Sequence, residues 1–153
     1  MADRACEIVI NAPVDVVFGC VEDPENFNAL MPGVTFGDVV RTPEGVGTTY
    51  RFRTRVAGVT IRGAGQFVEF ERNRLIRDET TVATEGSFSW RFEPLASGTR
   101  LTLEHHAGRF WGVPLLGRIL ADSYQRSDED VLRRIKTACE QQASEAHRTA
   151  STC

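Results

Sequence analysis

The sequence contains few side chains that could exchange a proton near neutral pH next to an apolar surface. His105 follows Leu101 and Leu103 at two-residue steps, so a strand here would place all three on its inward face. A neutral imidazole can accept or donate a proton near pH 7. His105 is therefore a candidate acid or base, and a histidine hydrogen-bonded within the core is the alternative. His106 faces the other way, and His147 lies in the C-terminal tail.

An inward carboxylate would add a second titratable group. Asp78 and Glu79 are adjacent in a predicted strand, so one side chain faces inward and the other outward. Both faces of this strand are mixed in polarity, which leaves its phase open, and we take Glu79 as the candidate. A buried carboxylate needs a partner, for which Arg77 and His105 are available.

Known catalytic and metal-binding motifs are missing from the sequence. The histidines are scattered and form no metal-ligand spacing. The sequence contains no nucleophile elbow, catalytic Ser/His/Asp spacing, phosphate-binding loop or nucleotide fingerprint. We therefore expect neither a metal nor a cofactor. Whether the protein is an enzyme stays open, with more weight on a non-enzymatic role.

Length and composition are those of an ordinary globular protein. The 153 residues predict one domain over 1–146 and a disordered tail over 147–153. A net charge of −3 argues against nucleic-acid binding, which needs a positive field. No apolar run is long enough to span a membrane, and no signal-peptide core is present, so we expect a cytoplasmic protein. The cysteines form no CxxC pair, and we expect free thiols at positions 6, 20, 139 and 153.

Most of the chain before residue 108 alternates in polarity and is divided by turn residues, which predicts strands. Two short helices follow the first strand, over 13–22 and 24–30, and Asp23 with Pro24 can start the second. Gly63 and Gly65 lie inside one strand and indicate a bend or a bulge. The predicted strands are 4–11, 34–41, 48–57, 59–72, 74–84, 86–94 and 99–107.

The long helix is predicted over roughly 114–146. Apolar and small residues recur there at three- and four-residue steps, which places them on one helical face. Because most of the chain is strand, this face can be buried only against the sheet. The residues of this face are Leu116, Leu120, Tyr124, Ser127, Val131, Ile135 and Ala138.

Several stretches resemble the START-like (SRPBCC) superfamily of polyketide cyclase/dehydrase, lipid-transport and Bet v 1-like proteins. They are INAPVDVVF (10–18), DPENF (23–27), PGV (32–34), VEF (68–70) and GTRLTLE (98–104). The resemblance spans residues 5–142. It implies an α+β helix-grip fold of order β-αα-β6-α. In this fold a seven-stranded curved antiparallel sheet wraps around the C-terminal helix and encloses a cavity.

On this fold, one face of each strand and of the helix would form a mostly apolar pocket wall with a few polar groups. The resemblance thus implies binding or transport of a small hydrophobic ligand of lipid, polyketide, isoprenoid or quinone type. The expected ligand-binding residues are Tyr50, Phe52, Thr54, Gln66, Val68, Phe88, Trp90, Phe92, Leu103, His105, Leu120, Tyr124, Ser127 and Val131. A filled core made by the same residues is the alternative.

Two other functions remain open. A polyketide cyclase or aromatase-like enzyme would use His105, Tyr50 and Glu79 as acid and base, without a metal. A protein- or membrane-interaction module would use the outer arginines 51, 53, 55 and 62, or the apolar stretch 110–117. The alternative for the arginines is a solvated face paired with Glu69, Glu71 and Glu93. Transient membrane contact and a monomer or homodimer are compatible with the sequence.

Overall fold

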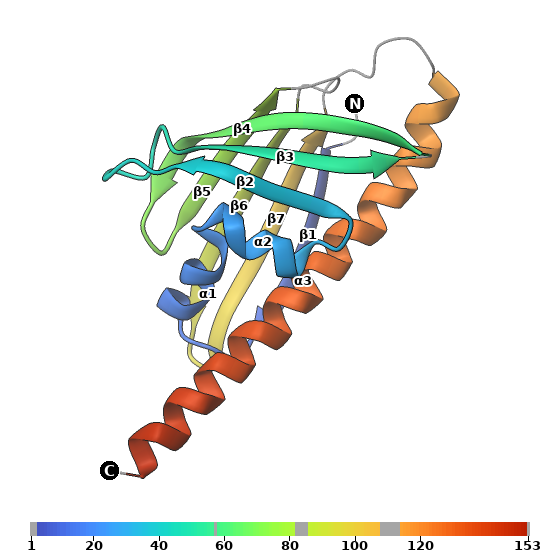
Figure 1. Ribbon diagram of the computed structural model, residues 1–153. Helices are drawn as coiled ribbons and strands as arrows, with labels where there is room; N and C mark the ends of the chain where they lie inside the picture. The colour runs from blue at the N-terminus through green and yellow to red at the C-terminus, as the bar shows by residue number, and fades with distance from the viewer. Residues whose placement is uncertain (1–2, 57, 82–85, 108–113, 153) are drawn as a thin grey trace.

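The computed structural model describes residues 3–56, 58–81, 86–107 and 114–152, with side chains for all of these except 3, 56, 107 and 114–125. Its order of elements is β-αα-β6-α, as the sequence predicts (Figure 1). The elements are β1 (Asp3–Ile10), α1 (Val14–Val21), the 3-10 helix η1 (Pro24–Asn26), α2 (Phe27–Leu30), β2 (Val34–Val40), β3 (Thr49–Val56), β4 (Val59–Glu71), β5 (Leu75–Thr81), β6 (Gly86–Leu95), β7 (Gly98–Ala107) and α3 (Pro114–Ser151).

The strands form one antiparallel sheet in the order β1-β7-β6-β5-β4-β3-β2. From β2 to β7, consecutive strands pair as a meander, whereas β1 pairs with the last strand, where Ile10 lies opposite Thr99. α3 crosses one face of this sheet, and α1 and α2 lie at its side (Figure 1). This arrangement confirms the helix-grip α+β fold.

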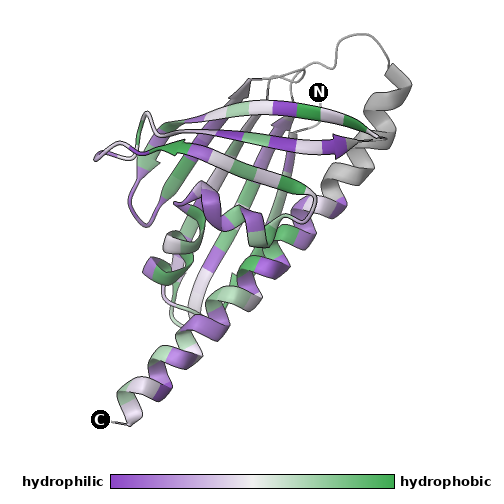
Figure 2. Cartoon of the chain, viewed as in Figure 1, coloured by the Kyte–Doolittle hydropathy of each residue, from purple (hydrophilic) through white to green (hydrophobic). Residues whose placement is uncertain are grey.

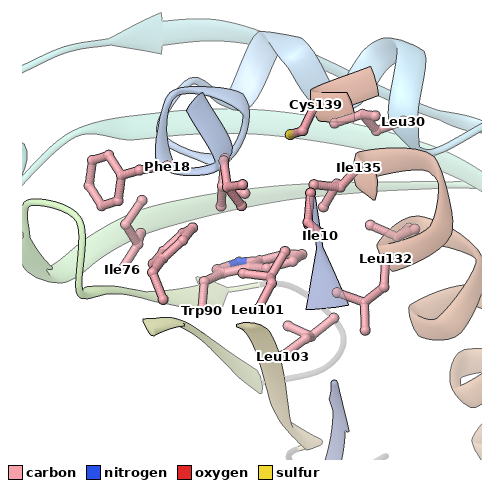
Figure 3. Packing of buried hydrophobic residues seen from close by; sticks show 14 of the residues in the cluster. Ile10, Phe18, Leu30, Ile76, Trp90, Leu101, Leu103, Leu132, Ile135 and Cys139 are labelled. Carbon is pink, nitrogen blue, oxygen red and sulfur yellow. The ribbon is translucent and has the colours of Figure 1, made fainter. Parts of the chain in front are cut away.

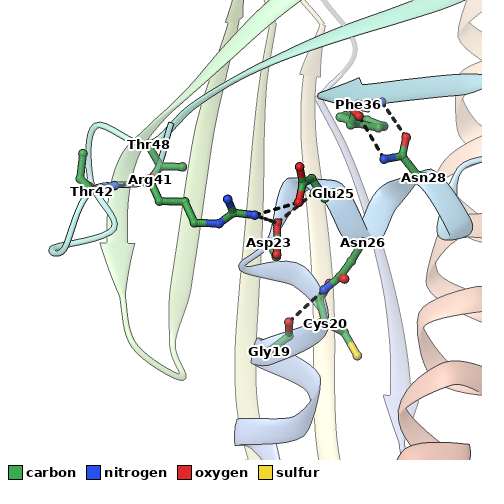
Figure 4. A network of polar contacts seen from close by, with 10 residues as sticks. All are labelled: Gly19, Cys20, Asp23, Glu25, Asn26, Asn28, Phe36, Arg41, Thr42 and Thr48. Carbon is green, nitrogen blue, oxygen red and sulfur yellow. Dashed lines mark hydrogen bonds and ion pairs between the residues drawn. The ribbon is translucent and has the colours of Figure 1, made fainter. Parts of the chain in front are cut away.

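Local signals set the short helices. Asp23 caps η1 by accepting a hydrogen bond from the backbone N–H of Glu25 at 3.1 Å, and Pro24 occupies the first helical position. Arg41, just after β2, donates to Asp23 at 2.7 Å and to Glu25 at 3.1 Å (Figure 4). The Asn28 side chain exchanges two hydrogen bonds with the backbone of Phe36. These contacts hold η1 and α2 against β2.

The most fully buried side chains gather where α1 and the middle of α3 meet the sheet (Figure 3). Phe18 is 1% exposed, and its ring centroid lies 5.0 Å from that of Phe92 and 5.3 Å from that of Phe70. Aliphatic side chains and one thiol fill the remaining space. They come from β1, α1, β5, β7 and α3, and include Ile10, Val17, Ile76, Leu101, Ile135 and Cys139.

α3 is amphipathic where its side chains are described: hydrophilic and hydrophobic positions alternate along its ribbon (Figure 2), and Val131, Leu132, Ile135 and Cys139 are buried. It is longer than the sequence predicts, because it continues through Ser151 and includes residues 147–151 of the predicted disordered tail. Hydroxyl groups in its last turns donate to the carbonyl oxygen four residues earlier, as Thr149 does to Glu145 at 3.0 Å. None of the described helices combines the length and apolarity that crossing a membrane requires.

Candidate functional site

A buried tyrosine and a buried carboxyl group meet on the inner face of the sheet. The Tyr50 hydroxyl on β3 donates a hydrogen bond to Oδ2 of Asp78 on β5. Tyr50 is 5% exposed and Asp78 is 6% exposed. A polar pair at this depth is unusual, because removing a carboxyl group from water is costly unless both of its oxygens find partners.

A second polar pair connects the sheet to α3. Nδ1 of His105 on β7 lies 3.2 Å from Oδ2 of Asp128 on α3. Both residues are buried, at 8% and 5% exposed. This contact fixes the register of α3 over the sheet at this point, because a shift of the helix along its axis would separate the two groups.

One member of each pair lies on the same cross-strand row. Asp78 on β5 is opposite Phe88 on β6, and Phe88 is opposite His105 on β7. The Phe88 and His105 rings stack with their centroids 4.2 Å apart. Directly opposite residues in a sheet share a face, so an aromatic ring separates two acid–base pairs on the inner face.

Asp78 carries the main chemical feature of this row. Its Oδ1 is buried and has no hydrogen-bond partner within the described residues. Burial raises the pKa of Asp78 from 3.8 to about 6, although the Tyr50 hydroxyl and nearby backbone N–H groups act in the opposite direction. The carboxyl group therefore changes its protonation near neutral pH and can act as a hydrogen-bond donor or acceptor at Oδ1.

The absence of a side chain on β4 leaves room for Tyr50. Gly65 lies directly opposite Tyr50, and a Cβ atom added at this glycine would overlap the tyrosine ring. Burial, followed by the charge of Asp78, raises the pKa of Tyr50 well above its usual value of 10. Tyr50 is thus a neutral hydrogen-bond donor whose position depends on a glycine at residue 65.

The structure assigns the inward carboxylate to Asp78 and not to Glu79. Glu79 is exposed and lies 3.7 Å from Arg77 on the outer side of the sheet. Alternation along β5 allows either Asp78 or Glu79 to face inward, and the hydrogen bond from Tyr50 shows that Asp78 does. The prediction that Glu79 faces inward is therefore wrong.

A bulge in β4 overturns the inward orientation predicted for two further residues. The pairing of β4 with β5 shifts between Phe67 and Glu69, so Val68 falls within the irregularity and is half-buried. Gly65 and Phe67 are buried, and Gln66 between them is exposed. Gln66 therefore cannot contact a ligand on the inner face, and Phe67 takes the expected place of Val68.

The other predicted ligand-binding residues divide into four groups. Phe52, Thr54 and Phe88 are half-buried, and Thr54 donates to the carbonyl of Gly33 at 3.1 Å. Ser127 is exposed on α3, contrary to its predicted inward position. Side chains of Leu120 and Tyr124 lie outside the described residues. Those that are buried are Trp90, Phe92, Leu103 and Val131.

Asp128 is a buried residue that sequence reasoning misses. It lies on the same helical face as Val131, Leu132 and Ile135, which are all buried, and helical spacing alone would include it. An aspartate in an amphipathic helix is ordinarily placed on the solvent side, so the pattern favours Ser127 instead. A buried partner such as His105 reverses this expectation.

The outer face of the sheet carries the predicted arginines. Arg51, Arg53, Arg55 and Arg62 are exposed there. The glutamates expected to pair with them contact other arginines: Glu69 pairs with Arg77, Glu71 with Arg74 and Glu93 with Arg100.

An open hollow of about 700 Å³ is lined by Thr35, Phe36, Gly37, Asp38, Arg51, Phe52, Arg53, Arg62, Gly63, Ala64 and Thr81.

This hollow is lined mainly by exposed outer-phase side chains and is distinct from the inner-face pairs. We take the inner face as the candidate site, because among the described residues it brings buried acidic and basic groups together. Residues 110–113 of the predicted apolar stretch lie outside the described residues. No cluster of metal-binding side chains is present in the described part of the chain.

Comparisons with known proteins agree with this fold. The family model described as "Polyketide cyclase / dehydrase and lipid transport" matches residues 1–140. None of the curated proteins matches the sequence. Among solved structures, the Zhui aromatase/cyclase from Streptomyces sp. R1128 superposes with a TM-score of 0.77 at 16% identity, covering 92% of this chain and 94% of that one.

Two further solved structures share this fold, and neither is named as an enzyme. The protein TTHA0849 from Thermus thermophilus has a TM-score of 0.70 at 21% identity, covering 95% of this chain and 99% of its own. Ara h 8.0201 has a TM-score of 0.67 at 16% identity, with coverage of 90% and 97%. Identities at this level support a common fold and leave the ligand open.

Proposed function

The chain belongs to the polyketide cyclase/dehydrase and lipid-transport family, and from this premise we propose that it binds a small, largely apolar molecule that carries at least one hydroxyl or carbonyl group. The ligand would lie between α3 and the inner face of the sheet. Lipids, polyketides, isoprenoids and quinones all fit this description. The family supports a small hydrophobic ligand, and the buried polar groups on the inner face support a ligand that also carries a polar group.

The observation that carries the proposal is the unpartnered Oδ1 of Asp78. Buried polar atoms are nearly always hydrogen-bonded, and leaving one unpaired costs about 1–3 kcal/mol. A ligand hydroxyl would donate to this oxygen when Asp78 is ionised. A ligand carbonyl would accept from the carboxyl group when Asp78 is protonated. The neighbouring rings of Tyr50 and Phe88 would contact the apolar part of the ligand.

The proposal is tested by ligand binding to matched variants. Palmitic acid, farnesol, menadione and an aromatic polyketide such as emodin would be titrated by calorimetry and by thermal shift. Asp78→Asn should weaken the best ligand about 10-fold, the equivalent of one lost hydrogen bond to a buried group. Glu79→Gln, one residue away and exposed, is the control and should bind like the wild type. Equal affinities for both variants, or no binding by any probe, would contradict the proposal.

A second function is favoured by the two buried pairs, Tyr50–Asp78 and His105–Asp128. In a cyclase-like reaction, one carboxylate or imidazole removes a proton from a carbon between two carbonyls. The carbanion attacks a second carbonyl carbon, whose oxygen takes a proton from Tyr50. Asp78 returns a proton to Tyr50 through their hydrogen bond, and loss of water follows. A poly-β-ketone thioester incubated with the protein would give a cyclised product, lighter by one water after dehydration.

Variants separate this activity from simple binding. Asp78→Asn and His105→Gln should each lower the rate of cyclisation by about 100-fold or more if these groups transfer protons. Binding of a non-reactive aromatic ligand should survive His105→Gln. Cyclisation at the spontaneous rate with wild-type protein would leave binding as the function.

A further inference from the structure

Two cysteines that are far apart in the sequence are in contact in the fold. Sγ of Cys139 on α3 lies 3.0 Å from Sγ of Cys20 on α1, 119 positions away in the chain. Both are free thiols, as is Cys6. A disulfide bond needs the sulfur atoms to approach to roughly 2 Å, so closing this pair requires a movement of about 1 Å in side chains that already face each other.

We propose that Cys20 and Cys139 form an oxidisable dithiol, a modification site at which a peroxide converts the pair to a disulfide that joins α1 to α3. This inference is independent of the proposed ligand, because the pair lies in the core between the two helices and not on the row of Asp78 and His105.

The surroundings assign different roles to the two thiols. Cys20 is half-buried, whereas Cys139 is 0% exposed, so a small oxidant reaches Cys20 first. The hydrogen bond donated by Cys139 lowers the pKa of Cys20, and the same bond, followed by burial, raises the pKa of Cys139. The more exposed thiol is therefore also the more acidic one, which is the combination that favours attack on a peroxide.

The reaction balances with a peroxide as the oxidant. The Cys20 thiolate attacks one oxygen of hydrogen peroxide, the O–O bond breaks, and a sulfenic acid forms with release of hydroxide, which takes up the thiol proton to give water. Sγ of Cys139 then attacks the sulfenic sulfur, the S–S bond forms, and a second water leaves. Both sulfur atoms are oxidised by one electron each, and the peroxide is reduced by two.

Mass spectrometry of the full chain tests the site. Reduced protein would be treated with hydrogen peroxide, alkylated and digested without reductant. Before alkylation the intact wild-type protein should be lighter by about 2 Da, and its digest should give one cross-linked peptide pair containing Cys20 and Cys139. Cys6→Ser, the matched control, should give the same cross-link. Cys20→Ser, a conservative change at a half-buried position, should abolish it.

A second readout reports on the helices. The disulfide would close a loop of more than about 100 residues, which restricts the unfolded chain. The oxidised wild type should melt roughly 5–15 °C higher than the reduced form, and oxidised Cys20→Ser should show no such rise. A cross-link through Cys6 or Cys153 in the monomer, or Cys20 oxidised to sulfinic acid with Cys139 still reduced, would overturn the proposal.

Discussion

Two ends of the same inner sheet face bury different kinds of side chain. Toward α1, Phe18 packs against Phe70 and Phe92 within an apolar cluster. Further along the strands, the inward positions carry Asp78 and His105. Close-packed rings and aliphatic groups stabilise the first end, whereas burying titratable groups at the second end costs stability. The difference separates the part of the interior that holds the fold from the part where we propose that a ligand binds.

The largest expected effect comes from breaking the apolar end. Phe18→Ala removes a side chain that is 1% exposed and leaves a cavity beside Phe70 and Phe92. The free energy of unfolding, measured by urea denaturation, should fall by about 3–5 kcal/mol. A loss below about 1 kcal/mol would mean that this end is not closely packed.

The polar end should make stability depend on pH. The folded protein keeps the Asp78 proton up to about pH 6, whereas the unfolded chain releases it near pH 3.8. The stabilisation is therefore complete below the unfolded pKa and is lost as the pH rises through the folded one. This group should lower the free energy of unfolding by about 3 kcal/mol between roughly pH 3 and pH 7.5.

The measurement is the difference in unfolding free energy between wild type and Asp78→Asn across this range. Other titrating groups cancel in that difference, and the amide cannot ionise. Glu79→Gln should leave the wild-type pH dependence unchanged. If the difference in unfolding free energy between wild type and Asp78→Asn does not vary with pH, ionising Asp78 does not destabilise the folded protein, and the prediction is wrong.

A smaller loss of stability is expected from a substitution at Gly65, where β4 contacts Tyr50 on β3. Gly65→Ala places a methyl group where the Tyr50 ring lies, so the ring must move and its hydrogen bond to Asp78 must weaken. Overpacking of this kind should cost about 1–3 kcal/mol. Ligand affinity should fall in parallel, by calorimetry, because the hydroxyl loses its position. Gly37→Ala, where an added Cβ meets nothing within 4 Å, is the matched control.

The smallest effect on stability is expected for Ser127, which is adjacent to the buried Asp128 on α3. Ser127 is exposed and Asp128 is 5% exposed beside His105. Ser127→Ala should change stability by no more than about 0.5 kcal/mol and leave ligand binding unaltered. Asp128→Ala should be clearly destabilising in the same urea experiment, because His105 loses its buried partner. If the two variants have the same free energy of unfolding, Asp128 is not buried against the sheet.

The fold could be predicted from the sequence because its signals are local and repeated. Alternation and turn residues together identify the strands, and Asp23 with Pro24 marks the start of a short helix. The family resemblance supplies the curvature of the sheet, which periodicity cannot reveal. The elements deviate most at the end of α3, where the helix continues beyond the predicted boundary and hydroxyl groups bond to its backbone.

The candidate site was less predictable, because it depends on which residues of each strand face inward and on contacts between residues far apart in the sequence. Tyr50 and His105 are inward, as alternation suggests. The bulge at Val68 changes the face of Gln66, and no local signal in the sequence marks its position. The choice between Asp78 and Glu79 requires Tyr50, which lies two strands away.

The contact between Cys20 and Cys139 could not be predicted either. Their separation fits no known cysteine spacing. The two thiols meet only because α3 returns across the sheet to α1, and that geometry is a property of the complete fold.

The pairing of the first strand with the last has a consequence for how the chain folds. Ile10 finds its partner at Thr99, and Asp3 finds its partner at His106. During synthesis, each strand from β3 to β7 can pair with the strand before it as it emerges, but β1 has no partner until residues 98–107 follow. Contacts this distant in sequence slow folding, because a long loop must close before they form. We therefore expect docking of β1, together with α3, to be the last and slowest step of folding.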